Sequence, residues 1–163
     1  MTILGIDPGQ AGSIVALFGN QSNLDIELMP LKPNKDIDFK KVKEILESYS
    51  ELYEEIHIFL ERALPMAMGS KHAFNYGRGF AAIEIAIEEL EIPVTYVEPA
   101  KWAKLMHDGI NTKYKTKEKS AIAFKRLFPK LVPKIPKSKK GRLHEGVVEA
   151  TLIAAYGQRI LLK

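Results

Sequence analysis

Four acidic residues lie either at the end of an apolar segment or within one, and their positions suggest a shared chemical role. Asp7 ends a short apolar run near the N-terminus, and Glu61 ends a second one. Glu145 and Glu149 are four residues apart in a largely apolar segment, so on a helix they share one face. A carboxylate buried alone is costly, so each needs water, a partner or a metal ion.

The chemistry of these ligands favours a hard divalent cation. Cysteine is absent, which removes thiol nucleophiles, disulfides and cysteine metal sites. Oxygen ligands alone suit Mg²⁺ or Mn²⁺ rather than zinc. Two such ions about 4 Å apart activate water and stabilise the leaving oxygen in phosphodiester hydrolysis. The competing interpretation is that Glu145 only favours a helix N-terminus through the dipole while Glu149 points to water.

The charge of the chain is distributed unevenly, although the net value is only +4. From Lys101 to Arg142 there are 14 Lys or Arg against two acids, Asp108 and Glu118, which gives +12. The remainder holds 10 basic and 18 acidic residues, which gives −8. A basic block on an otherwise acidic chain indicates a partner made of phosphates, whereas a solubilising surface is the alternative.

The elements that must position these residues follow from apolar patterning. Short β-prone segments at 2–6, 12–18 and 24–28 predict three antiparallel strands, the first two joined by the turn Asp7-Pro8-Gly9. Further strands at 56–60 and 93–97 then alternate with helices at 38–52, 69–90, 118–127 and 145–162. The order predicts an α/β fold with a mixed sheet flanked by helices, in a single domain of residues 1–163. The lysine- and proline-rich stretch 129–142 is predicted as an extended loop.

The same composition argues against a membrane protein. No run of about 18 apolar residues occurs, and the N-terminus lacks the pattern of a signal peptide. The absence of cysteine also suits a reducing compartment, so we expect a cytoplasmic protein.

Five motifs follow one another along the chain: GIDPGQAGSIVAL, LERA, GRGFAAIEIAIEELEIPVTYVEPAKWAKLM, TKEKSAIAFKRLFP and HEGVVEATLIAAYG. In that order they resemble the RuvC-type Holliday junction resolvases of the RNase H-like superfamily, most closely the short bacteriophage-encoded members. If the chain is phage-encoded, the expected cytoplasm is that of the host. The resemblance implies a five-stranded RNase H-like sheet of three antiparallel and then two parallel strands. It also implies a homodimeric endonuclease that resolves Holliday junctions and related branched DNA in recombination and repair. Each active site would bind two Mg²⁺, for which Mn²⁺ would substitute.

By the same resemblance Asp7, Glu61 and Glu149 are metal ligands and catalytic residues. The family commonly carries its last two acids as Asp, three residues apart, but position 146 here is Gly. Glu145 is the expected substitute, and His144 is a second candidate whose alternative role is at the helix N-terminus.

The resemblance also implies a set of DNA contacts. Lys119 matches a lysine near the scissile phosphate, where it would stabilise charge, and Lys104 matches a second basic contact. In the stretch 65–80, Phe74 and Tyr76 would wedge against or stack on unpaired bases, or else serve as core or dimer contacts. The remaining expected phosphate contacts are Lys71, Arg78, Lys137, Lys139 and Lys140.

A helix after Gly79 is expected at the dimer interface, although packing on its own sheet is the alternative. Its small or apolar residues are Ala81, Ala82, Ile83, Ala86 and Ile87. Three other functions compete with a resolvase: a less selective branched-DNA or flap nuclease of the same fold, an actin-like ATP-binding domain, and a non-catalytic DNA-binding domain. The chain lacks the second phosphate loop that an actin-like domain needs, and the four acids argue against a non-catalytic DNA-binding domain.

Overall fold

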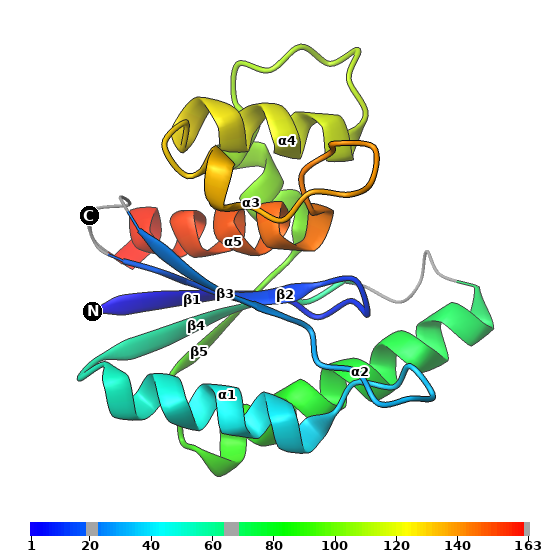
Figure 1. Ribbon diagram of the computed structural model, residues 1–163, viewed down its shortest axis with the longest axis vertical. Helices are drawn as coiled ribbons and strands as arrows, with labels where there is room; N and C mark the ends of the chain where they lie inside the picture. The colour runs from blue at the N-terminus through cyan, green and yellow to red at the C-terminus, as the bar shows by residue number, and fades with distance from the viewer. Residues whose placement is uncertain (19–22, 64–68, 162–163) are drawn as a thin grey trace.

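The computed structural model describes residues 1–18, 23–63 and 69–161, and its centre is a five-stranded mixed sheet (Figure 1). The strand order is β3-β2-β1-β4-β5. β1 pairs with β2, and β2 with β3, antiparallel, whereas β4 pairs parallel with β1 and β5. The predicted sheet of three antiparallel and two parallel strands is confirmed. The strands are β1 Thr2–Asp7, β2 Ser13–Leu17, β3 Leu24–Leu28, β4 Ile56–Glu61 and β5 Val94–Val97.

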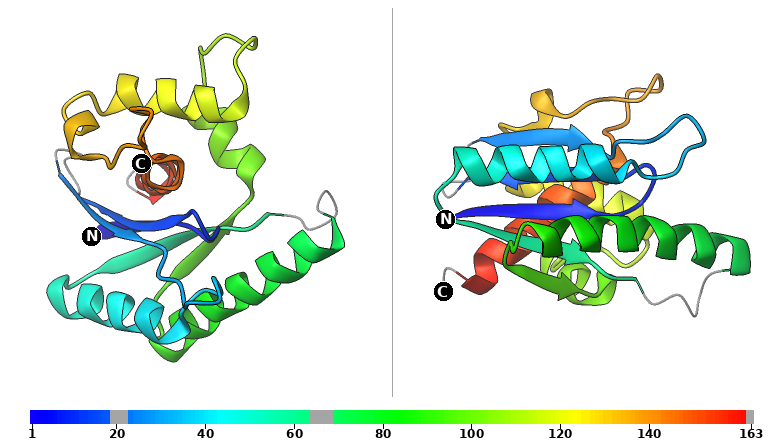
Figure 2. Two further views of the ribbon diagram at one scale, coloured as in Figure 1. Left: turned by 45° about the vertical axis from the view of Figure 1, so that its right-hand side comes forward. Right: turned by 90° about the horizontal axis from the view of Figure 1, so that it is seen from below.

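Helices cover both faces of this sheet, as Figures 1 and 2 show. One face carries α1 Phe39–Leu52 and α2 Ser70–Glu89. The other carries α5 Glu145–Leu161 directly on the sheet, with α3 Pro99–Met106 and α4 Thr116–Leu127 packed outside it. The central strands are therefore buried on both sides and read as continuous apolar runs.

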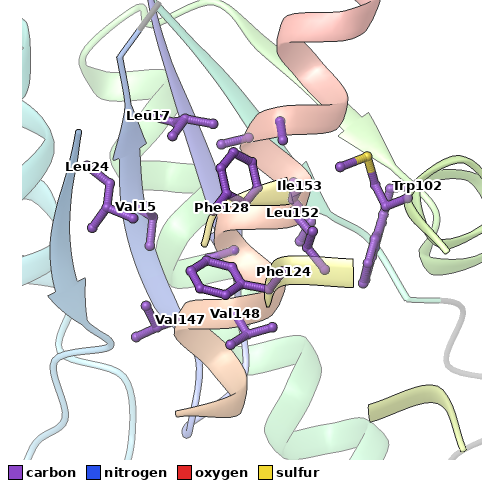
Figure 3. Close-up of a cluster of buried hydrophobic side chains, with 14 of the residues drawn as sticks. Val15, Leu17, Leu24, Trp102, Phe124, Phe128, Val147, Val148, Leu152 and Ile153 are labelled. Atoms are coloured by element: carbon purple, nitrogen blue, oxygen red, sulfur yellow. The ribbon is translucent and has the colours of Figure 1, made fainter. Parts of the chain in front are cut away.

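Alternate residues of each central strand enter different cores. Ile3 of β1 joins a cluster with α5 that includes Val15, Phe124 and Leu152 (Figure 3), whereas its neighbour Leu4 joins the cluster under α1 and α2. Because side chains alternate along a strand, every second position of β1 and β4 faces α5.

Local sequence signals explain where the helices begin. Asp38 lies at the N-cap of α1, where its side chain accepts a hydrogen bond from the Lys41 N–H at 3.5 Å. Val42, Leu46 and Tyr49 form the buried stripe of that helix. The C-terminal helix was expected to reach residue 162, which lies outside the described residues.

Two segments differ from the expectation. The stretch after β5, where no helix was predicted, forms the helix α3, which begins with Pro99 in its first turn and buries Trp102 and Met106, one turn apart, beside α5. The 129–142 segment is folded rather than extended. It contains the 3-10 turn Val132–Lys134 and then a tight turn in which the Ser138 N–H donates to the Arg142 carbonyl at 2.8 Å.

The expected dimer face of α2 is partly wrong. Ile83, Ala86 and Ile87 are buried against the sheet and α1 in their own chain, so they are not available to a partner. Ala81 and Ile85 lie on the opposite, exposed side, and Ala82 is half-buried. Within the described ranges, no helix is both long enough and apolar enough to cross a membrane.

Candidate active site

Asp7 and Glu61 lie side by side because of the register of the parallel pair β1 and β4. Ile6 is paired with Leu60, and each acid is the next residue on its strand. Phe59 faces the core under α5, so Glu61, two residues further on, faces the same way. Neighbouring strands are about 4.8 Å apart, which brings the two carboxylates to one edge of the sheet.

The N-terminus of α5 is brought to this edge by an unusually close approach of two backbones. A Cβ atom on Gly146 would lie 2.2 Å from the Ala11 carbonyl oxygen and 2.7 Å from the Gly12 Cα. The buried Ser13 hydroxyl also donates to the Gly146 carbonyl at 3.0 Å. No side chain fits at position 146, which explains physically why the acid that the resemblance led us to expect there is absent. The adjacent acids of the helix are Glu145 and Glu149.

Three of the four carboxylates share one electrostatic environment. Burial raises the pKa of Glu61 to about 7, and the charges of Asp7 and Glu149 raise it further, against a hydrogen bond from Trp102 that lowers it. Burial also raises the pKa of Glu149 to about 7, again with Asp7 contributing. The pKa of Asp7 is raised by burial, although the Gly9 N–H opposes this by donating to Oδ1 at 3.1 Å. The edge of the sheet is therefore short of positive charge.

Protein donors engage two of the acids. The Trp102 indole N–H donates to Glu61 Oε2 at 2.6 Å. The Lys117 ammonium forms an ion pair with Glu145 Oε2. In the part of the chain that the structure describes, no three His, Asp or Glu side chains gather closely enough to hold a metal ion as they stand. Closure around a cation would require side-chain movement.

His144 has a structural role at the start of α5. Its Nδ1 accepts a hydrogen bond from the Val147 N–H at 3.3 Å, and its carbonyl accepts one from the Val148 N–H. These contacts satisfy backbone donors at the beginning of the helix.

The lysine that contacts the acids is Lys117, which the sequence reasoning missed. Lys117 lies in the first turn of α4, and its charge acts on Asp7 and Glu149 as well as on Glu145. Lys119, two residues later, acts instead on His107, whose pKa is lowered by burial and then by that charge. Residues two apart on a helix point in different directions, which explains the difference.

The α2 residues that we expect to contact DNA differ in whether other groups of the protein already hold them. Phe74 is 65% exposed, and the Arg78 guanidinium lies over its ring at 5.7 Å. Arg78 also pairs with Asp36 at 2.9 Å. The Tyr76 hydroxyl accepts a hydrogen bond from the Ala63 N–H at 2.9 Å, so this ring is tied to the end of β4. Only Phe74 of the two aromatics is free to meet a base; Lys71 is exposed near the start of the same helix.

A cavity of about 580 Å³ opens beside the acids. The β1–β2 turn, the 32–39 segment, the N-terminal half of α2 and Lys117 line it, with Gln10, His72 and Asn75 among its polar residues. Beyond α2, the lysines at positions 104, 137, 139 and 140, on α3 and in the 129–142 segment, are all exposed. Basic side chains are therefore open to solvent on α2 as well as on these two segments.

Comparisons with known proteins identify the fold. No protein-family model matches the chain, and no curated protein sequence matches it. The solved structure of Thermus thermophilus RuvC in complex with a Holliday junction substrate matches with a TM-score of 0.65 at 15% identity, over 99% of this chain and 96% of that chain. A second structure of Thermus thermophilus RuvC matches with a TM-score of 0.60 at 18% identity, over 98% and 96%. The chain has the fold of RuvC, a member of the RNase H-like class of folds.

Proposed function

We propose that this protein is a divalent-metal-dependent endonuclease that resolves Holliday junctions and related branched DNA as a homodimer. The observation that carries the proposal is the convergence of Asp7, Glu61 and Glu149, from β1, β4 and α5, at one edge of the sheet, where the charge of Asp7 raises the pKa of both Glu61 and Glu149. Carboxylates that repel one another at half-buried positions are a costly arrangement unless a cation joins them.

The donor set fits Mg²⁺ or Mn²⁺. The three half-buried acids supply only carboxylate oxygens, and Glu145 would complete the set from the same helix face as Glu149. Two ions held there would activate a water and stabilise the leaving oxygen of a phosphodiester. The residues of the chain do the rest: Trp102 orients Glu61 through its indole N–H, and the Gly9 N–H fixes Asp7.

DNA would cross the acidic edge and contact positive charge on both sides. On the α5 side, the exposed lysines 104, 137, 139 and 140 would hold backbone phosphates, which fix position rather than sequence. Lys119 would stabilise charge at the cut, as the resemblance implies. On the other side, Lys71 would take a phosphate and Phe74 would stack on an unpaired base at the branch.

Two-fold symmetry of a four-way junction is matched by a dimer with two sites related by a dyad. The exposed side of α2, with Ala81 and the 48%-exposed Ile85, is the surface that we assign to the partner. Ile85→Lys should convert the dimer to a monomer in light scattering. It should also uncouple the two cuts, so that the two strands of one junction are no longer cut together.

The experiment that tests the function compares cleavage of a labelled four-way junction, a flap and a plain duplex with Mg²⁺, Mn²⁺ or EDTA. Wild type should cut the junction symmetrically with either metal, and Asp7→Asn should bind the junction without cutting it. Faster cleavage of the flap would make the protein a flap-type nuclease of the same fold. If Asp7→Asn cut the junction as fast as wild type, or if wild type cut it in EDTA, the proposed mechanism would be wrong.

A further inference from the structure

The ion pair between Lys117 and Glu145 joins the first turns of two helices at the acidic edge. Both partners are open to solvent, with 68% of the Lys117 side chain and 50% of the Glu145 side chain exposed. Besides this contact, the Lys117 charge acts on Glu149 and on Asp7. A single ammonium thus partly neutralises three of the four acids that we assign to the metal.

Lys117 also lies between two spaces. It lines the large cavity beside the acids, together with Gln10, Lys32 and Arg78. It also lines a pocket of about 20 Å³, just large enough for a water molecule, with Glu145, Glu149 and Ser120. The ammonium can therefore reach either the acids or the cavity by rotating its own side chain.

We propose that Lys117 is a built-in counter-ion of the acidic site, which a divalent cation must displace from Glu145 and which then turns toward the cavity to meet a DNA phosphate. This inference rests on the proposed metal-dependent function and adds a residue that holds the metal-free site together. It also links metal loading to DNA binding, because the released ammonium becomes available to phosphate only when the metal is bound.

Physical chemistry makes such an exchange favourable. An exposed ion pair between Lys and Glu is weak and holds two long side chains in one geometry, so its loss costs little. A divalent ion carries twice the charge of the ammonium and binds several carboxylates at once. The lysine stem is flexible and its charge is a compact point, which suits movement between two anionic partners.

The single tryptophan of the chain provides a direct readout of metal binding. Trp102 is buried, and its indole N–H lies on Glu61 Oε2, so a cation at Glu61 should change its fluorescence. We would titrate Mg²⁺ into the DNA-free protein and follow both Trp102 fluorescence and heat by calorimetry. Lys117→Met should bind Mg²⁺ more tightly than wild type, on the order of twofold to fivefold, because the competitor is gone.

Two variants control for charge alone. Lys117→Arg keeps the competing cation and should bind Mg²⁺ with the wild-type affinity. Lys125→Met removes one exposed positive charge from the far end of the same helix and should also leave the affinity unchanged. Amine acylation followed by mass spectrometry then reads the displacement itself. The labelling rate of Lys117, relative to that of Lys125 in the same sample, should rise when Mg²⁺ is added and remain constant with added KCl.

The possible failures are distinguishable. If wild type shows neither heat nor a fluorescence change with millimolar Mg²⁺ or Mn²⁺, the metal site itself is wrong, and the Lys117 inference falls with it. If wild type binds the metal but Lys117→Met binds it equally or more weakly, only the role of Lys117 is overturned. A Lys117 labelling rate that does not respond to Mg²⁺ would likewise show that the ammonium stays on Glu145.

Discussion

Gly146 offers the sharpest test of how the candidate site is assembled. Any side chain there would press against the β1–β2 turn, since a Cβ atom would lie 2.2 Å from the Ala11 carbonyl oxygen. Both colliding partners are backbone atoms, so no side-chain rotation relieves the contact. Gly77 in α2 is the matched control, because a Cβ atom there meets nothing within 4 Å.

The two Gly→Ala substitutions should change stability in opposite directions. Alanine is favoured over glycine in a helix interior by about 1 kcal/mol, so Gly77→Ala should raise the free energy of unfolding by about 0.5–1 kcal/mol. At Gly146, in the first turn of α5, the gain is smaller, and overpacking against backbone costs up to about 3 kcal/mol. Gly146→Ala should therefore lose about 2 kcal/mol, which for a chain of this size corresponds to roughly 4–8 °C in Tm.

Urea unfolding followed by circular dichroism measures both changes under one condition. Gly146→Ala should also reduce cleavage beyond its effect on folding, because relief of the collision moves Glu145 and Glu149 away from Asp7. If Gly146→Ala proves as stable as wild type, the close approach of α5 to the β1–β2 turn is not the feature that excludes an acid at position 146.

Other predictions address charge. Because Glu61 and Glu149 have a pKa of about 7 in the fold against 4.5 for an ordinary Glu, the folded state binds protons more tightly, and the free energy of unfolding in EDTA should fall as pH rises from about 4.5 to 7. One such group changes the free energy of unfolding by about 3 kcal/mol at most, and bound Mg²⁺ should offset this loss of stability. A free energy of unfolding that rises with pH in EDTA would contradict the prediction. Glu145→Gln should reduce Mg²⁺-dependent cleavage more than His144→Ala, and the reverse ranking in parallel assays would transfer the ligand role to His144. A triple alanine variant of the turn lysines should flatten the salt dependence of junction affinity by about 0.9 for each lysine in contact, with the saturated cleavage rate unchanged; an unchanged slope would remove that turn from the interface. The three residues are Lys137, Lys139 and Lys140.

The sheet and its acids could be predicted because the signals are local. Asp7 and Glu61 each follow a short apolar strand, and once both strands are parallel and adjacent, their ends must coincide. Asp38 marks the start of α1, because Asp is a favoured N-cap residue and lies directly before the apolar pattern of that helix. α3 was missed because its eight residues were interpreted only through the resemblance. The one-turn spacing of Trp102 and Met106, after a proline, is the signal that would have found it.

The contacts around the acids could not be predicted, because they depend on how α4 and α5 lie together in space. Sequence matching selected Lys119, yet Lys117 is the residue that reaches Glu145. The composition of α2 likewise suggested an interface at Ala86, but helix phase relative to the sheet buries that residue in its own core. Whether a small apolar residue meets its own sheet or a partner is decided by that phase.

The packing of α5 on β1 has a consequence for biosynthesis. Strand β1 and helix α5, near opposite ends of the described chain, pack extensively against each other, so β1 and β2 remain uncovered on that face until the ribosome has released residues near 161. A chain that has grown only to Leu143 contains Asp7 and Glu61 but neither Glu145 nor Glu149. Such contacts between distant parts of a chain form late and slowly during folding. If the proposed function is right, products that end before α5 would therefore be unable to cut DNA, and activity would arise only after α5 has been translated.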